Sequence, residues 1–413
     1  MAEIKPFFCI RPSQELAARV AALPYDVYNR EEACKEVKRE PLSFLAIDRA
    51  ETQFDDSVDT YDERVYKKAK ELLEERILDG TFVADEKECY FLYQLTMNGR
   101  SQTGIVACAS IDDYLNQVIK KHENTRAEKE ADRIRHVDTC NAQTGPIFLA
   151  YRSNPVLNEV MDQVKREVPL YRFVSIDGVG HTVWRVEDAQ RITLIRDIFA
   201  SIEQIYIADG HHRAASAVKV GLKRREAHPA YTGQEEFNYF LSVLFPDDQL
   251  FIMDYNRVVK DLNGYSVEEF LEKVGESFVV EAMGEKPYAP VKVHEIGMYL
   301  DGIWYRLEAK PEVCIDHPVE GLDVSILQNT LLEPLLGIGD PKTDTRIDFV
   351  GGIRGLEELE RRAKTDMRVA FTMYPTSIKQ LFDVADAQLL MPPKSTWFEP
   401  KLRSGLFIHR LDG

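Results

Sequence analysis

The sequence predicts a mixed α/β protein with more than one domain, and three observations support this. Its 413 residues are too many for one ordinary hydrophobic core, so we expect two or three domains. Apolar residues make up 44% and charged residues 29% of the chain, which is the composition of a soluble globular protein. Short β-prone runs are interspersed with amphipathic helical stretches, without an internal repeat or a low-complexity segment.

Composition also excludes some classes of function. The formal net charge is −17, from 52 basic and 69 acidic residues, so the phosphates of nucleic acid would be repelled and we expect no nucleic-acid partner. The six cysteines contain no CxxC pair, which argues against a zinc knuckle or a disulfide framework. No run of eighteen apolar residues occurs, so we expect a cytoplasmic protein without a membrane partner.

Residues 1–105 read as an N-terminal α/β segment. A helix is predicted over Tyr61 to Leu78, whose apolar residues fall on one stripe. A hairpin is predicted from the runs 90–95 and 104–109, because Asn98-Gly99 between them is typical of a tight turn. These elements are interpreted mostly as scaffold.

A polar segment, Lys120 to Arg126, opens a charged helix that runs to about His136. The ordinary interpretation is a solvated charged face. His122-Glu123 would also suit half of a zinc site, but the HExxH pattern fails because residue 126 is arginine.

The chain is organised around residues 204–225. Ile205 to Ile207 form a β-prone run, and an amphipathic helix is predicted to begin near Arg213. The turn between strand and helix contains Asp209, Gly210, His211 and His212.

This turn has the features of an anion site. A helix start directs free backbone N–H groups and a partial positive charge outward, and Gly210 lets the backbone approach a ligand closely. His211, His212 and Arg213 offer up to three cationic or donor side chains. The alternative is an ordinary Asp-Gly turn before a solvated helix start. The sequence contains no GxxxxGK[ST] stretch, so a P-loop is excluded.

Further along, the runs 241–245 and 250–253 are predicted to form a hairpin, and a C-terminal α/β domain is expected over 259–413. Near its end, a strand and a helix precede two prolines, which present a rigid loop. That loop contains Lys394, Ser395 and Thr396. By itself it would be a surface loop.

Three of these stretches together resemble the free serine kinases of the ParB/sulfiredoxin-like superfamily. They are the segment Asp209 to Arg213, the pair His122-Glu123 upstream, and the loop Lys394 to Thr396. The resemblance implies a ParB/sulfiredoxin-like nucleotide-binding core with an insertion over 106–258, flanked by additional N-terminal and C-terminal α/β segments. Two features differ from those kinases: the segment between the first two motifs is longer, and Phe398 replaces a histidine.

The resemblance implies a phosphotransferase that makes O-phosphoserine from free L-serine and ATP or ADP, with Mg²⁺. Glu123 would be the catalytic base, aided by His122, and Asp209 would be a carboxylate near the metal or the phosphate. The phosphates would bind to Gly210, His211, His212 and Arg213. The substrate contacts would come from Lys394, Ser395 and Thr396.

Five stretches lie along the chain at residues 24–27, 41–45, 122–125, 209–213 and 391–401. On these stretches the chain, over its whole length, is identified as a member of a broad prokaryotic family long labelled as of unknown function. Two other functions stay open. A nucleotide-binding regulator of the ParB type would use the same phosphate site without turnover. A sulfiredoxin-like redox enzyme would need a cysteine in the loop where this chain has histidine, so it ranks last. A homodimer is compatible with either function.

Overall fold

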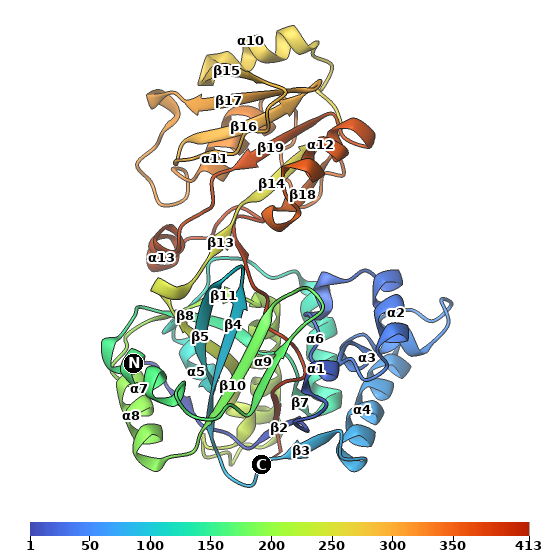
Figure 1. Ribbon diagram of the computed structural model, residues 1–413, viewed down its shortest axis with the longest axis vertical. Coiled ribbons are helices and arrows are strands. Elements are labelled where there is room, and N and C mark those ends of the chain that lie inside the picture. Colours follow the sequence, from blue (N-terminus) through green and yellow to red (C-terminus); the bar gives the residue numbers. More distant parts are fainter. Residues whose placement is uncertain (413) are drawn as a thin grey trace. The chain divides into compact units, whose positions relative to one another are not determined.

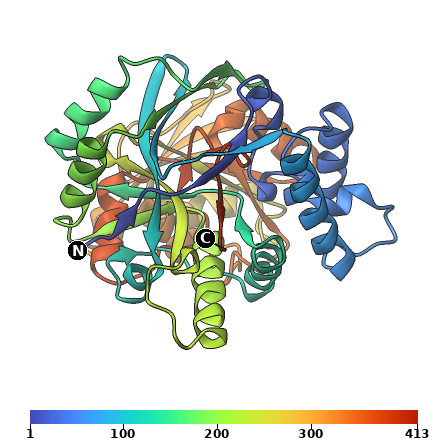
Figure 2. The ribbon, with the colours of Figure 1, turned by 90° about the horizontal axis from the view of Figure 1, so that it is seen from below.

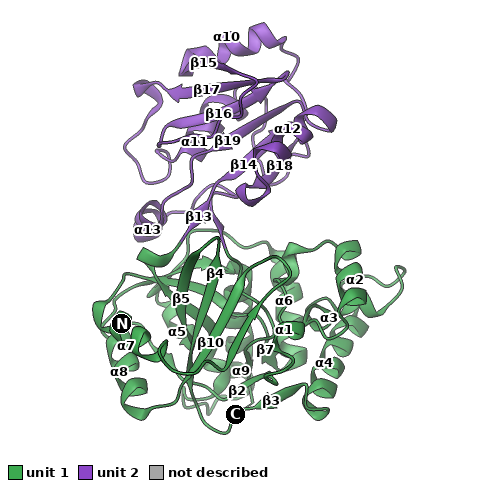
Figure 3. Ribbon diagram, viewed as in Figure 1, with its two compact units in different colours: residues 1–250, 400–413 green, residues 251–399 purple. Residues whose placement is uncertain are grey.

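The computed structural model describes residues 1–412 as a mixed α/β protein with several sheets, divided into two compact units (Figure 3). Unit 1 comprises Met1–Leu250 together with the C-terminal residues from Pro400 onward, and unit 2 comprises Phe251–Glu399. This division differs from the expected segments 1–105, 106–258 and 259–413. The first two expected segments share one sheet, and the C-terminal residues return to unit 1, because strand pairing joins parts of the chain that are far apart in sequence.

Unit 1 contains a nine-stranded sheet, drawn in Figure 1. Its strands are β1 (Ile4–Lys5), β4 (Tyr90–Met97), β5 (Arg100–Ser110), β6 (Ile119–Lys120), β8 (Ile147–Tyr151), β9 (Tyr171–Val174), β10 (Gly180–Val186), β11 (Ile205–Asp209) and β12 (Tyr239–Pro246). Their order is β6-β11-β8-β12-β5-β4-β10-β9, with β1 beside β5. The predicted hairpin β4–β5 is confirmed, with Asn98 and Gly99 both at positive φ in its turn.

Most neighbouring strands of this sheet are antiparallel, but two pairs are parallel, β6 with β11 and β8 with β12. Ile205 pairs with Ile119, and Tyr206 pairs with Lys120. The carboxyl ends of these two strands therefore lie side by side, and the loops that leave them emerge at the same edge of the sheet.

A second, four-stranded sheet of unit 1 has the order β3-β2-β21-β7. Its strands are β2 (Cys9–Pro12), β3 (Phe82–Ala84), β7 (Ala142–Gln143) and β21 (Ile408–Arg410). Through β21, the C-terminal residues pair with both an N-terminal strand and a central one.

The helices of unit 1 cover the sheets. They are α1 (Ala17–Val20), α2 (Arg30–Arg39), α3 (Leu45–Asp48), α4 (Glu63–Leu78), α5 (Ile111–Leu115), α6 (Ala127–Cys140), α7 (Pro155–Val164), α8 (Ala189–Phe199) and α9 (His211–Ala227), with short 3₁₀ turns η1 (Tyr25–Val27), η2 (Ala50–Gln53), η3 (Glu236–Asn238) and η4 (Asp247–Gln249). Helices α2 to α4, in blue, lie together at one side of the large sheet in Figures 1 and 2, and α4 packs against α6. The predicted helix over Tyr61 to Leu78 is confirmed as α4, capped by Asp62.

Helix α9 is buried along one face because Ala214, Ala217 and Val218 join the apolar core formed by the large sheet. These residues are three or four positions apart and therefore share a face. The packing of this face fixes the start of α9 at the end of β11.

Unit 2 is built on a six-stranded antiparallel sheet of order β15-β17-β16-β19-β14-β18. Its elements are β13 (Ile252–Met253), β14 (Tyr255–Val259), α10 (Val267–Ser277), β15 (Phe278–Gly284), β16 (Glu295–Leu300), β17 (Ile303–Ala309), η5 (Pro311–Val313), α11 (Asp323–Leu327), the π-helical turn η6 (Gln328–Leu332), β18 (Ile347–Gly351), η7 (Gly352–Arg354), α12 (Leu356–Thr365), β19 (Val369–Met373), α13 (Ile378–Asp386) and β20 (Trp397–Phe398).

The hairpin predicted from the runs 241–245 and 250–253 is wrong. Strand β12 pairs with β5 and β8 within unit 1, whereas β13 pairs with β20 within unit 2. The two runs have partners distant in sequence, and the turn between them marks the boundary of the units.

No helix in the described part of the chain combines the length and the apolar character needed to cross a membrane.

Candidate functional site

The candidate site lies where β11 ends and α9 begins. Gly210, between them, adopts the left-handed conformation with φ 93°. A Cβ at this position would meet the Arg213 guanidinium at 2.9 Å, so both backbone conformation and space favour glycine. The first helical hydrogen bond runs from the Ala214 N–H to the Gly210 carbonyl. The N–H groups of residues 211–213 therefore precede the helical ladder and are suited to an anion.

The predicted strand, turn and helix are present, but α9 begins at His211 rather than near Arg213. Both histidines therefore lie in the first helical turn. Nε2 of His212 accepts the Arg126 N–H over 2.9 Å, and Nε2 of His211 accepts the His122 N–H over 3.5 Å. These bonds require neutral rings with the proton on Nδ1.

Burial lowers the pKa of both histidines, and for His211 the neighbouring His122 lowers it further. Of the cationic or donor roles expected for His211 and His212, the cationic role is therefore absent at neutral pH. Instead, these two side chains attach the loop 121–126 to the start of α9.

His122 is 2% exposed, and its ring lies 4.5 Å from that of His211 in an edge-to-face arrangement. Among the described residues, neither of its ring nitrogens has a hydrogen-bond partner. Burial lowers its pKa to about 4, so it is neutral at physiological pH. A buried imidazole with unused donor and acceptor atoms is suited to contact a ligand or an ordered water.

Glu123 is half-buried in the loop that connects β6 to α6. His122, before it, and Arg126, after it, both donate backbone N–H groups to the first turn of α9. The structure thus brings the pair His122-Glu123 and the segment Asp209 to Arg213 to the same edge of the sheet.

Asp209 is the last residue of β11, and its two oxygens have different partners. Oδ1 accepts the Gly210 N–H over 2.8 Å, and Oδ2 accepts a hydrogen bond from Nζ of Lys401 over 3.1 Å. Burial alone would raise the pKa of Asp209, but Lys401 and Arg213 outweigh it and hold the pKa well below its usual range. Asp209 is therefore ionised, and it holds the Lys401 ammonium beside the turn of residues 209–213, the proposed phosphate turn.

Sequence reasoning missed Lys401. Its side chain is only 15% exposed, and it belongs to the C-terminal residues that return to unit 1. Its position at the end of the stretch 391–401, five residues after the predicted substrate loop, is the local signal that could have found it.

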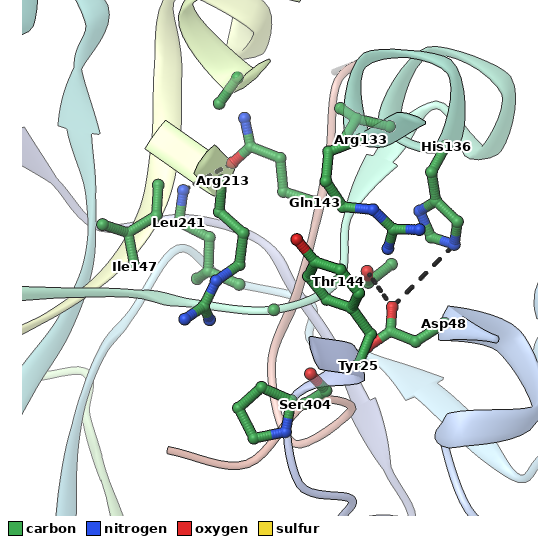
Figure 4. A pocket seen from close by; sticks show the side chains of 14 residues that line it. Tyr25, Asp48, Arg133, His136, Gln143, Thr144, Ile147, Arg213, Leu241 and Ser404 are labelled. Atoms are coloured by element: carbon green, nitrogen blue, oxygen red, sulfur yellow. Dashed lines mark hydrogen bonds and ion pairs between the residues drawn. The ribbon is translucent and has the colours of Figure 1, made fainter. Parts of the chain in front are cut away.

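Arg213 points toward the loop before β8, where its Nη1 donates to the Pro146 carbonyl over 2.6 Å. It also lines a small pocket with Tyr25, Asp48 and Arg133, shown in Figure 4. Within residues 1–412, no three His, Cys, Asp or Glu side chains gather in a way that could hold a metal ion. A metal at Asp209 would therefore have to take most of its ligands from a substrate.

The predicted substrate loop lies in unit 2, and its backbone is well anchored there. Lys394 is exposed with φ 61°, and its carbonyl accepts a bond from Arg257. The Ser395 hydroxyl donates to the Pro392 carbonyl over 2.7 Å, and the Thr376 hydroxyl donates to the Ser395 carbonyl. Thr396 is half-buried. The roles of Lys394, Ser395 and Thr396 toward a substrate stay predictions.

A family model described as protein of unknown function (DUF1015) matches residues 4–325. Similar solved structures include a free serine kinase in complex with AMP, 14% identical, which covers 75% of this chain and 91% of its own with a TM-score of 0.37. SbnI with a C-terminal truncation, from Staphylococcus aureus, is 10% identical and covers 74% and 87% with a TM-score of 0.39. No curated protein sequence matches the chain.

Proposed function

The chain belongs to the family described as protein of unknown function (DUF1015), and we propose that it is a kinase that phosphorylates free L-serine with ATP or ADP as donor. In this proposal, unit 1 contains a ParB/sulfiredoxin-like nucleotide-binding core. The observation that carries the proposal is the meeting of two loops at the ends of β6 and β11. One loop brings Glu123, and the other brings the start of α9 with Asp209, whose carboxylate is bonded to Lys401 of the C-terminal residues.

The donor phosphates would bind at the start of α9. The N–H groups of residues 211–213, the Arg213 guanidinium and the Lys401 ammonium supply donors and positive charge there. Phosphoryl transfer needs mainly positioning and stabilisation of charge on the transferred group, and these groups provide both. His211 and His212 would act by holding the loop that contains Glu123, and the free ring nitrogens of His122 would bond to a substrate or a water.

Glu123 would act as the general base. It takes the proton from the serine hydroxyl while that oxygen attacks the terminal phosphorus of the donor, and the bond from phosphorus to the bridging oxygen breaks. ADP leaves when ATP is the donor, and AMP leaves when ADP is the donor. The product is O-phosphoserine.

The site suits Mg²⁺ when the substrate phosphates supply most of the ligands of the metal. Mg²⁺ prefers oxygen ligands and is usually held by one or two carboxylates together with substrate phosphates. Asp209 offers such a carboxylate beside the phosphate turn, although Oδ2 is shared with Lys401. When bound with the donor, Mg²⁺ would neutralise charge on the phosphates.

The test is a product screen. The protein is incubated with ATP or ADP, Mg²⁺ and each amino acid in turn, and the products are identified by ³¹P NMR and mass spectrometry. We expect O-phosphoserine from serine, and none from alanine, which lacks the hydroxyl. Retention of nucleotide without a product from any amino acid would contradict the kinase proposal and favour a ParB-type regulator.

A further inference from the structure

A polar cavity in unit 1, which the proposed chemistry does not use, lies along helix α6. It has a volume of about 300 Å³ and is lined by the inward face of α6, by the turns η1 and η2, and by the start of α4. Lys129, Arg133 and His136 of α6 are three or four residues apart and line it together. A volume of this size is within the range of small-molecule sites.

A smaller pocket, called the neck below, shares four lining residues with the cavity and is also lined by Arg213 of helix α9. The neck is the small pocket of Figure 4, about 30 Å³, with room for about one or two water molecules. Arg213 and Ala217 of α9 line the neck, while Tyr25, Asp48, Arg133 and His136 line both the neck and the cavity. A ligand that occupied both places would have to widen the neck by moving the Tyr25 ring, over which the Arg133 guanidinium lies at 4.0 Å.

The charges of the cavity are opposite to those of the phosphate turn. Five carboxylates but only three basic side chains line the cavity, together with four tyrosines. Two of the basic side chains are already paired, Arg49 with Glu51 and Arg133 with Asp132. Phosphate is therefore disfavoured in the cavity, while an uncharged aromatic group with hydrogen-bond donors would be favoured.

Asp48 lines both the neck and the cavity, and its carboxylate is the group there best suited to a specific ligand contact. It is 5% exposed, and its Oδ1 accepts the Thr144 hydroxyl over 3.0 Å, with His136 Nε2 at 4.0 Å. Among residues 1–412, no hydrogen bond is found for Oδ2 of Asp48. A carboxylate oxygen in that position can accept hydrogen bonds from neighbouring hydroxyl groups, such as those of a ribose.

We infer that this cavity binds the nucleoside of the phosphate donor, with its base beside the tyrosines, its ribose at Asp48 and its phosphates beyond the neck at Arg213. A nucleoside phosphate has one anionic end and one uncharged, donor-bearing aromatic end, which matches the two charge environments. The inference rests on the proposed function and adds the location of the nucleoside to it.

The test compares two probes by isothermal titration calorimetry: ADP, which has a nucleoside, and pyrophosphate, which does not. Asp48→Asn should weaken ADP binding at least tenfold, and Tyr61→Ala at least fivefold, since the second variant removes an aromatic ring on which the base would stack. Both variants should bind pyrophosphate within twofold of the parent. Tyr61 is 48% exposed, so its replacement should not impair folding. Tyr231→Ala, an exposed tyrosine outside the cavity, is the matched control.

A second measurement does not depend on variants. Photo-crosslinking with 8-azido-ADP, followed by peptide mapping, should label peptides within residues 25–66 or 127–136. Three results would overturn the inference while leaving the kinase proposal standing. They are unchanged ADP affinity in both variants, an equal loss of ADP and pyrophosphate affinity, and labelling of other peptides. If the parent binds neither probe, the proposed function falls and this inference falls with it.

Discussion

The backbone N–H of Arg126 donates to Nε2 of His212 over 2.9 Å, and this bond connects two loops that are 86 residues apart in sequence. With the bond from His122 to His211, it fastens both ends of the short segment that contains Glu123. The relative position of Glu123, the proposed base, and the turn at Gly210 is therefore set by the fold before a substrate binds. Pre-organisation of this kind is what phosphoryl transfer requires.

Replacement of Arg213 by alanine should weaken nucleotide binding severely. A charge-assisted bond from arginine to phosphate contributes about 1.5–3 kcal/mol, so we expect a ten- to hundredfold rise in the Kd of ADP. Calorimetry on the folded variant measures it, and Arg213→Lys, which keeps the charge but not the planar fork, should lose less. An unchanged Kd in Arg213→Ala would exclude Arg213 from the phosphate site.

Replacement of Lys401 by methionine should affect both binding and stability. The variant should bind ADP about tenfold more weakly, because one cation of the phosphate turn is lost. It should also be about 1 kcal/mol less stable at pH 7, a modest value because Asp209 is one-third exposed.

The stability effect of Lys401→Met should depend on pH with a defined sign. The pKa of Asp209 is depressed in the folded protein, so its pairing stabilises above the ordinary carboxyl pKa of about 4 and is lost as pH falls through the folded value. The difference from the parent should therefore shrink below about pH 4, as measured by urea unfolding. Lys401→Arg should resemble the parent, and a pH-independent difference would indicate a packing effect instead.

The lowered pKa of His122 should reduce the free energy of unfolding of the protein in mild acid. This pKa is about 4 in the folded protein, below the ordinary value of 6.5, so the unfolded chain binds more protons between these limits. The free energy of unfolding should fall as pH drops from 6.5 to 4, by up to about 3 kcal/mol from this residue.

The matched variant is His122→Phe, which keeps an aromatic ring against His211 and removes the titration. Urea unfolding at a series of pH values should give a flatter profile for this variant than for the parent. Equal slopes in the two proteins would mean that His122 titrates normally and is not buried in solution.

Elements whose formation depends on residues close together in sequence could be predicted from the sequence. Helix α4 follows from the spacing of its apolar residues, and the β4–β5 hairpin follows from Asn98-Gly99. The strand, turn and helix around Gly210 were predicted with the helix start only two residues late. Local periodicity and turn chemistry are sufficient for such features.

Features that depend on distant pairing could not be predicted. The return of the C-terminal residues to unit 1, which brings Lys401 to Asp209, depends on the pairing of β21 with β2 and β7. The charge state of His211 and His212 depends on their burial, which a sequence motif does not reveal. A motif can therefore identify the residues of a site without giving their protonation.

The loop of unit 2 should determine the affinity for the acceptor. Lys394→Met and Thr396→Val should each raise the KM for serine at least tenfold, because each removes a polar contact proposed for the substrate. The Kd of ADP should not change, since the proposed phosphate contacts belong to unit 1. Lys379→Met, which removes an exposed lysine elsewhere in unit 2, is the control. Unchanged KM values would show that this loop does not contact the substrate.

Glu123→Gln should abolish most of the turnover while leaving nucleotide binding nearly intact. The amide keeps the size and most hydrogen bonds of the carboxylate but cannot accept the proton of the serine hydroxyl. General-base catalysis typically contributes about 10²–10⁴ in rate, so kcat should fall at least a hundredfold.

Glu128→Gln, on the exposed start of α6, is the matched control for Glu123 and should retain full activity. Steady-state kinetics and ADP calorimetry on both variants separate a catalytic effect from a binding effect. Because the loop around Glu123 is fastened at both ends by His211 and His212, the substitution should not displace the phosphate turn. Turnover of Glu123→Gln within a few-fold of the parent would transfer the role of base to Asp209, the carboxylate at the end of β11.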